Sequence, residues 1–269
     1  MQPAATLPTL KRRIDDYLRE DALPMRRLRE ILSTQFEPLG PIAIIGGLVR
    51  DIARRGKVGF RSDIDLVVDA TPEAVAALAL KLGAMPNRFG GFSSIQPHWK
   101  VDFWSLPNTW AAAVGLVQVK SLADLVHTTF FDCDAICYEI GKKRLHALPG
   151  YLELINKRSI DVNLLPNPSI DGNLLRASRR ILLWGFRPGP GLQSFIEREL
   201  NEHSFARIVD IERSLYPNSV LDHFASAPGL CEALLNDKAS KLFPTFGEQL
   251  DFPGFDAEWR IPTTNQIKL

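Results

Sequence analysis

Short apolar segments alternate with amphipathic ones between residues 41 and 105, and this alternation restricts the possible folds more than any other feature. Three segments have the length and the apolar or alternating pattern of buried strands: 41–47, 63–69 and 98–105. Two segments between them have helical spacing and end at a glycine: 48–56 and 71–83. Strands that alternate with helices predict an α/β (α+β) fold with a small mixed β-sheet and flanking helices.

Helical patterns flank this central region on both sides. Apolar residues at helical spacing predict one or two helices over 8–35, with a break at Pro24. A helix is expected to begin at Ser121, and a strand or a short helix is expected over 129–140. From about residue 151 the chain is expected to be mostly helical, with a loosely structured tail.

The composition is that of a globular protein and excludes several classes of function. The 269 residues are 45% hydrophobic, and 32 basic residues balance 31 acidic ones. A net charge of +1 does not indicate a strongly basic nucleic-acid-binding protein, although residues 142–213 carry 12 Lys/Arg against 8 Asp/Glu. No segment predicts a membrane span or a secretory signal, and three cysteines at this low density favour a cytoplasmic location.

A glycine pair and three aspartates form the most specific motif in the chain. The first predicted strand ends in Gly46-Gly47, and the second begins with Asp63 and Asp65. Residues i and i+2 of a strand point to the same face, so these two carboxylates bring like charges together. A divalent cation compensates such charge, and Asp102 from the third strand would complete an oxygen site for two Mg²⁺ ions.

Each part of this motif also has an ordinary structural explanation. Asp-x-Asp is common on solvated strand edges, a glycine pair forms turns, and a single strand aspartate is often exposed. Their joint order favours phosphoryl or nucleotidyl transfer, in which one cation activates a hydroxyl and another stabilises the triphosphate. The glycine turn would let the backbone approach phosphate oxygens, and the fork of Arg50 would bind them.

Two motifs carry a resemblance to a known family. The segments IIGGLVRDIARRG and RSDIDLVVD resemble the head domain of poly(A) polymerases and CCA-adding enzymes, in the DNA polymerase β-like nucleotidyltransferase superfamily. Weaker similarity continues through NRFGGFSSI, TFFDCDAICY, GYLELINKRSI and NLLRASRRILLWGF. The resemblance implies an N-terminal helical segment over 1–38, a nucleotidyltransferase head over 39–150, and a helical neck and short helical C-terminal part over 151–269.

The resemblance also implies a role for each candidate residue. Asp63, Asp65 and Asp102 would be catalytic and would bind the metal ions, with Asp102 on the side of the attacking hydroxyl. The nucleotide would be bound by residues of the glycine turn, of the segment after the head sheet and of the neck: Gly46, Gly47, Arg50, Asp51, Asp134, Arg176 and Arg179.

The chain departs from the family pattern where specificity is determined. The family's Arg-Arg-Asp is replaced by the segment 128–130, which reads Thr-Thr-Phe. Asn173 stands at the first of two neck arginine positions, and Glu153 stands where the family has aspartate. These departures, together with the short region after the neck, predict a compact relative rather than a housekeeping CCA-adding enzyme.

These patterns predict Mg²⁺-dependent transfer of a nucleoside monophosphate from an NTP to a hydroxyl, with release of pyrophosphate. The expected acceptor is an RNA 3′ end, such as that of a tRNA. One alternative is transfer to a small molecule or a protein, as in antibiotic-modifying or toxin-like enzymes. Another is a non-catalytic relative that binds nucleotide or RNA.

Two further groups of residues are open to more than one interpretation. Three tryptophans lie near Asp102 in the sequence: Trp99, Trp104 and Trp110. Core packing explains them most simply, and a base-stacking platform near the metal site is the alternative. Three histidines lack the spacing of metal ligands and are expected to be structural or surface residues: His98, His127 and His146.

Overall fold

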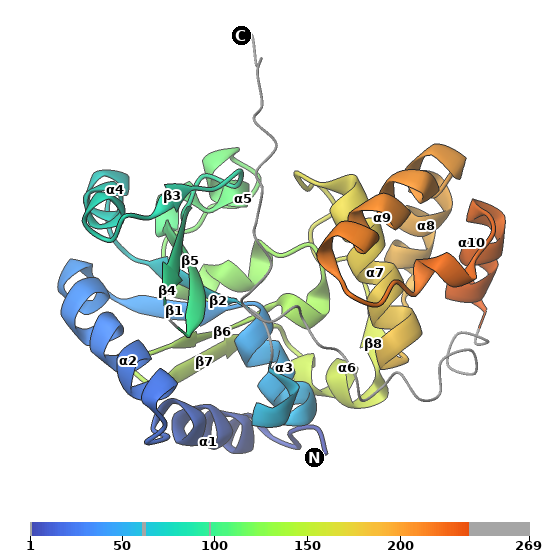
Figure 1. Cartoon of the computed structure of the whole chain (residues 1–269). Coiled ribbons are helices and arrows are strands. Elements are labelled where there is room, and N and C mark those ends of the chain that lie inside the picture. The colour runs from blue at the N-terminus through green and yellow to red at the C-terminus, as the bar shows by residue number, and fades with distance from the viewer. Residues whose placement is uncertain (1, 61–62, 97, 237–269) are drawn as a thin grey trace, which may run out of the picture.

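A seven-stranded mixed sheet forms the centre of the computed structural model, which describes residues 2–60, 63–96 and 98–236 (Figure 1). Its strand order is β3-β4-β5-β2-β1-β6-β7. The neighbours β2 and β5 run parallel, and the other neighbouring pairs are antiparallel. The strands are β1 (Ile42–Ile45), β2 (Ile64–Val68), β3 (Met85–Pro86), β4 (Phe92–Gln96), β5 (Trp99–Ser105), β6 (Ile136–Glu139) and β7 (Arg144–Ala147). The predicted mixed α/β fold is therefore confirmed.

The two faces of the sheet contribute to different hydrophobic clusters. Ile44 of β1 and Leu66 of β2 belong to the main core, which also includes residues of the N-terminal and C-terminal helices. The alternate residues Ala43 and Val67 pack in a smaller cluster with a short helix on the opposite face. Because side chains alternate along a strand, Asp65 lies on this second, less completely covered face.

The N-terminal helices pack against the sheet as their amphipathic pattern predicts. They are α1 (Leu7–Leu18) and α2 (Leu23–Ile31), and Figure 1 shows α1 below β7 and beside α3 (Gly47–Arg55). The predicted break falls just before Pro24, which lies in the first turn of α2. A proline is tolerated there because its φ fits a helix and its missing N–H would have no partner in the helix. The buried hydroxyl of Tyr138 in β6 donates a hydrogen bond to Asp15 of α1.

Two other elements show how local sequence sets the boundaries. The helix predicted over 71–83 is α4 (Pro72–Lys81), and the Thr71 side chain accepts a hydrogen bond from the Ala74 amide at its N-terminus. The helix expected at Ser121 is present over Leu122–His127, and it is a 3₁₀-helix. Ser121 and Asp124 nevertheless form a capping box at its start.

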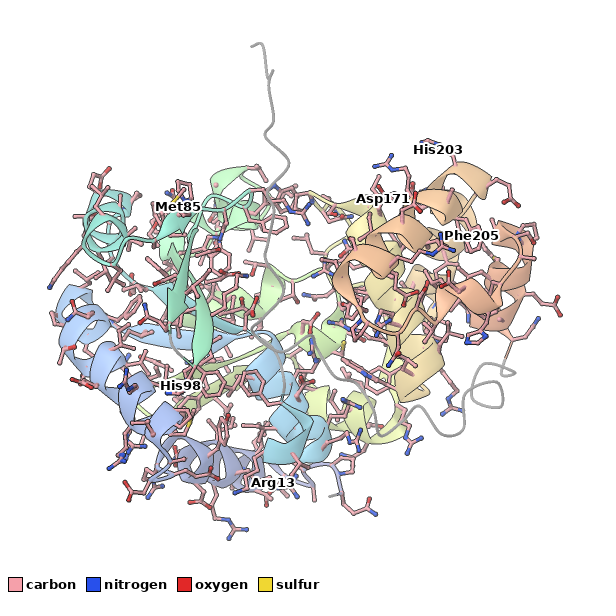
Figure 2. The ribbon with its side chains drawn as sticks, in the orientation of Figure 1. Arg13, Met85, His98, Asp171, His203 and Phe205 are labelled. Carbon is pink, nitrogen blue, oxygen red and sulfur yellow. The ribbon has the colours of Figure 1, made fainter. Side chains whose placement is uncertain are left out.

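The C-terminal half is mostly helical, as predicted. Its elements are α6 (Tyr151–Lys157), β8 (Ser159–Ile160), α7 (Ile170–Trp184), β9 (Arg187–Pro188), α8 (Pro190–Glu199), α9 (Glu202–Leu215) and α10 (Ala227–Leu235), and the short helix α5 (Trp110–Ala113) precedes this region. The helix α7 packs against α8, α9 and α10. Asp171 at the start of α7 forms an ion pair with Arg207 of α9, at the end of this helical group where His203 also lies (Figure 2).

Two predictions concern membrane spans and the C-terminal tail. No helix in the described residues combines the length and apolarity needed to cross a bilayer. The predicted loose tail falls after residue 236, outside the described residues.

Candidate active site

Three carboxylates meet where the parallel strands β2 and β5 begin. Asp65 of β2 is the direct partner of Asp102 of β5 in the parallel register, and Asp63 comes two residues before Asp65. The alternation of side chains places all three on the same face of the sheet. The strand context predicts that these three residues lie together, and the structure confirms this arrangement.

Burial and the neighbouring carboxylates raise the pKa values of two of these aspartates. Burial, followed by the charges of Asp102 and Asp63, raises the pKa of Asp65 to about 8. Burial also raises the pKa of Asp63, even though that carboxylate accepts a hydrogen bond from Lys100. The Asp102 Oδ1 atom is buried and has no hydrogen-bond partner among the described residues.

The ammonium of Lys100 lies between two of the carboxylates. Its Nζ is 2.7 Å from Asp63 Oδ2 and 3.0 Å from Asp102 Oδ2. Burial alone would lower the pKa of Lys100, but the two carboxylates raise it above its ordinary value. Sequence reasoning missed this residue, although its position two residues before Asp102 on an alternating strand places it on the same face.

The glycine pair forms the wall of the site next to Asp65. Gly46 has φ +66°, and a Cβ there would come within 2.9 Å of Asp65 Oδ2. It precedes the first turn of α3, which begins at Gly47, so the free amides of that helix end lie beside the carboxylates. A glycine is therefore needed both for the backbone conformation and for the close approach.

The arginine predicted to bind phosphate is held by carboxylates in the interior. Arg50 donates to Asp51 Oδ1 at 2.9 Å and to Asp134 Oδ1 at 2.7 Å, and its side chain is only 8% exposed. Asp134 also accepts hydrogen bonds from Arg180 at 2.8 and 3.2 Å. This arrangement gives Asp134 a role that the sequence did not indicate, because it links α3 to α7.

The two predicted neck arginines have separate partners. Arg176 donates to Asn173 in the preceding turn, and Arg179 forms an ion pair with the buried Glu212 of α9. The guanidinium of Arg179 also lies over the Tyr216 ring, 3.6 Å from its centroid. The sequence placed Arg176 and Arg179 on one helix face, but it gave no indication of Glu212 or Tyr216.

A cavity of about 510 Å³ is lined by several of these residues. Carboxylates and glycines beside β2 and α3 line one part of it, and residues of α7 line another. The lining residues that carry the argument are Gly46, Asp63, Asp65, Asn173, Arg176 and Arg179. Its size lies within the range of sites that bind small molecules and cofactors.

The three tryptophans divide between the two interpretations. Trp99 stacks on Phe60 with centroids 5.9 Å apart and donates to the Pro24 carbonyl, so it packs against the N-terminal helices. Trp104 and Trp110 line the cavity, so their positions are compatible with the interpretation that they stack on a base.

The three histidines do not gather at the site. His98 lies at the lower end of β4 and β5, far from the α7–α10 helices in Figure 2, and borders a separate cavity of about 390 Å³. His146 lies 3.2 Å from Glu139, and His127 is exposed.

The donor set at β2 and β5 suits a hard divalent cation. Three carboxylates share one face, and the buried Asp102 Oδ1 atom lacks a partner that an ion would supply. Within the described ranges, no three His, Cys, Asp or Glu side chains are arranged so that they could hold an ion as they stand. The residues therefore fit a metal in their chemistry, and side chains must move for them to converge on it.

Comparison with known structures identifies the fold. No family sequence model and no curated protein matches the chain in sequence. The Thermotoga maritima CCA-adding enzyme complexed with tRNA has a TM-score of 0.51 and 16% identity, and the match covers 92% of this chain and 55% of that one. The fold is the nucleotidyltransferase head fold of the CCA-adding enzymes.

Two further CCA-adding enzyme structures support this assignment. A complex with CTP has a TM-score of 0.50 and 18% identity, and the match covers 91% of this chain and 56% of that one. A complex with ATP has a TM-score of 0.51 and 16% identity, and the match covers 84% of this chain and 55% of that one. The chain thus spans about half the length of the CCA-adding enzymes it matches.

Proposed function

We propose that the chain is a Mg²⁺-dependent nucleotidyltransferase that moves a nucleoside monophosphate from an NTP to the 3′ hydroxyl of an RNA. The observation that carries this proposal is the pairing of Asp65 with Asp102 on parallel strands, with Asp63 beside them at the cavity. The CCA-adding head fold, in which the matched structures contain CTP, ATP or tRNA, supports the same reaction class.

The three aspartates are the residues that would hold the metal ions. Mg²⁺ bound there would lower the pKa of the attacking hydroxyl and neutralise charge on the triphosphate. The 3′ oxygen attacks the α-phosphorus, the bond to the β-phosphate oxygen breaks, and pyrophosphate leaves. We assign the proton of the hydroxyl to the carboxylate of Asp102, which lies beside Asp65 in the register of β2 and β5.

The triphosphate and the base would occupy different parts of the cavity. The amides at the start of α3, next to the Gly46-Gly47 turn, would face the phosphates. Arg50 supports this wall through its bonds to Asp51 and Asp134. The base would lie toward the neck, where aromatic rings and polar side chains line the cavity: Trp104, Trp110, Asn173, Arg176, Arg179 and Tyr216.

Nucleotide incorporation into RNA tests the proposal. The purified full chain is incubated with Mg²⁺, total RNA and each α-labelled NTP in turn, and the labelled products are separated by size. We expect label on RNA, loss of that label in Asp63→Ala, and normal labelling in Asp69→Asn. Asp69 is a matched control because it is an exposed carboxylate just after β2, away from the cluster.

The outcomes separate the competing functions. Wild-type incorporation by Asp63→Ala would contradict the assigned mechanism. Label that appears on protein or on a small molecule, and disappears in the variant, would retain nucleotidyl transfer but replace RNA as the acceptor. NTP binding without any labelled product would favour a non-catalytic nucleotide-binding protein.

A further inference from the structure

A lysine occupies the place where the catalytic carboxylates face one another. Asp65 pairs with Asp102 and Ile64 pairs with Val101, so Asp63 and Lys100 are the next residues back on their strands. The Lys100 side chain spans this point and donates to Asp63 at 2.7 Å and to Asp102 at 3.0 Å. The ammonium thus binds two of the three side chains that would hold a divalent ion.

The charge balance explains why the lysine lies there. Three carboxylates repel one another on one face of the sheet, and the side chain of Asp102 is only 16% exposed. The Lys100 ammonium compensates Asp63 and Asp102, and its own side chain is 28% exposed. Without it, the partly buried Asp102 would lose a charge-assisted hydrogen bond as well as a counter-ion.

Lysine also has the side chain best suited to leave such a position. Its ammonium is a compact point charge on a flexible four-carbon chain, so it can exchange one anionic partner for another. The phosphates of an NTP at the start of α3 would offer that partner, because ammonium groups bind phosphate oxygens well.

We propose that Lys100 is a built-in counter-ion that competes with the divalent cation for Asp63 and Asp102 and leaves them when the triphosphate binds. This inference rests on the proposed function. This competition makes the binding of the ion and of the NTP cooperative. The triphosphate brings the ion with it and also binds the Lys100 ammonium, which frees the carboxylates. The same contact keeps the carboxylates ordered before substrate arrives.

Binding of Mn²⁺ to the full chain tests the competition without any turnover. Free Mn²⁺ is measured by electron paramagnetic resonance for wild type, Lys100→Met and the control Lys142→Met. Lys142 is an exposed lysine paired with Glu139, so its replacement removes the same net charge away from the site. We expect Lys100→Met to bind Mn²⁺ at least about tenfold more tightly than wild type, and Lys142→Met to match wild type.

A second readout uses the coupling to nucleotide. A non-hydrolysable NTP analogue should tighten Mn²⁺ binding strongly in wild type and much less in Lys100→Met, where there is no ammonium to displace. In EDTA, Lys100→Met should melt below wild type, and Mn²⁺ should raise its melting temperature more. If Lys100→Met does not fold, Lys100→Gln, which keeps a polar side chain, is taken through the same titration.

Mn²⁺ binding and nucleotide incorporation together distinguish a wrong counter-ion assignment from a wrong function. Equal or weaker Mn²⁺ binding by the Lys100 variants, in a protein whose wild type incorporates nucleotide, would overturn the counter-ion and leave the enzyme intact. Tighter binding with no incorporation by wild type would support the counter-ion and overturn the transferase. Absence of Mn²⁺ binding in every variant, with and without the NTP analogue, would overturn both.

Discussion

The ion-pair network around Asp134 connects α3 to α7, and its removal gives a measurable prediction. Asp134 accepts hydrogen bonds from Arg50 at 2.7 Å and from Arg180 at 2.8 Å. The side chains of the three residues are 13%, 8% and 6% exposed in that order, so water screens them little. In Asp134→Asn the shape is kept, Arg50 retains Asp51, and Arg180 loses its carboxylate.

The expected loss of stability follows from this burial. Breaking a buried pair and leaving one charge behind costs about 3–5 kcal/mol. Urea unfolding followed by circular dichroism should show a loss of this size in Asp134→Asn. The control Asp222→Asn breaks an exposed ion pair with Arg213 and should lose less than about 1 kcal/mol.

A second substitution tests whether the stranded charge causes the loss. The double variant Asp134→Asn/Arg180→Met should be more stable than Asp134→Asn alone, because it removes the uncompensated guanidinium. If Asp134→Asn loses no more stability than Asp222→Asn, the network does not hold the two parts together and the reasoning is refuted.

The same carboxylate predicts a pH dependence with a definite sign. Burial would raise the pKa of Asp134, but the guanidinium groups of Arg180 and Arg50 outweigh it and hold that pKa well below its ordinary value. A depressed pKa gives stability that is complete above the unfolded value of about 3.9 and is lost as the pH falls toward the folded value. The difference between wild type and Asp134→Asn should therefore stay constant from about pH 5 to 8 and shrink below about pH 4.

Two smaller perturbations test other parts of the structure. Gly46→Ala and Gly83→Ala both place alanine at a positive φ, but only at Gly46 does the new Cβ meet a carboxylate, that of Asp65. Gly46→Ala should lower both the melting temperature and the affinity for Mn²⁺ more than Gly83→Ala does. Equal effects of the two substitutions would show that the close approach to Asp65 is unimportant. Tyr138→Phe removes the hydrogen bond from β6 to Asp15 and should cost about 1–3 kcal/mol in urea unfolding. A cost near zero would mean that water replaces the hydroxyl there.

Local patterns were sufficient to predict the elements that position the carboxylates. The apolar run ending at Gly46, the Thr71 cap and the alternation from Trp99 to Ser105 each depend on neighbouring residues, and each prediction agrees with the structure. The 3₁₀-helix after Ser121 shows the limit, because a capping box marks a helix start and does not determine which helix follows. The strand β3 has two residues, too few for any periodicity to show.

The chemistry of the site was only partly accessible from the same patterns. Asp63 and Asp65 were joined by strand spacing, and the register of β2 against β5 brings Asp102 to them. Lys100 could have been found by the same alternation rule, since it precedes Asp102 by two positions on one strand. The pattern of a metal site is defined by its acidic ligands and does not include a cation that lies among them.

The partners of the arginines could not be predicted, for a physical reason. Arg50 and Asp134 are 84 residues apart, Arg180 and Asp134 are 46 apart, and Arg179 and Glu212 are 33 apart. No local propensity couples positions at such separations, since only the tertiary packing of different elements brings them together. A sequence motif therefore identifies an arginine near phosphate but not whether a carboxylate already holds it. For this reason Arg50, which spacing alone suggested as a phosphate ligand, is better tested as the support of the wall on which the phosphates would lie.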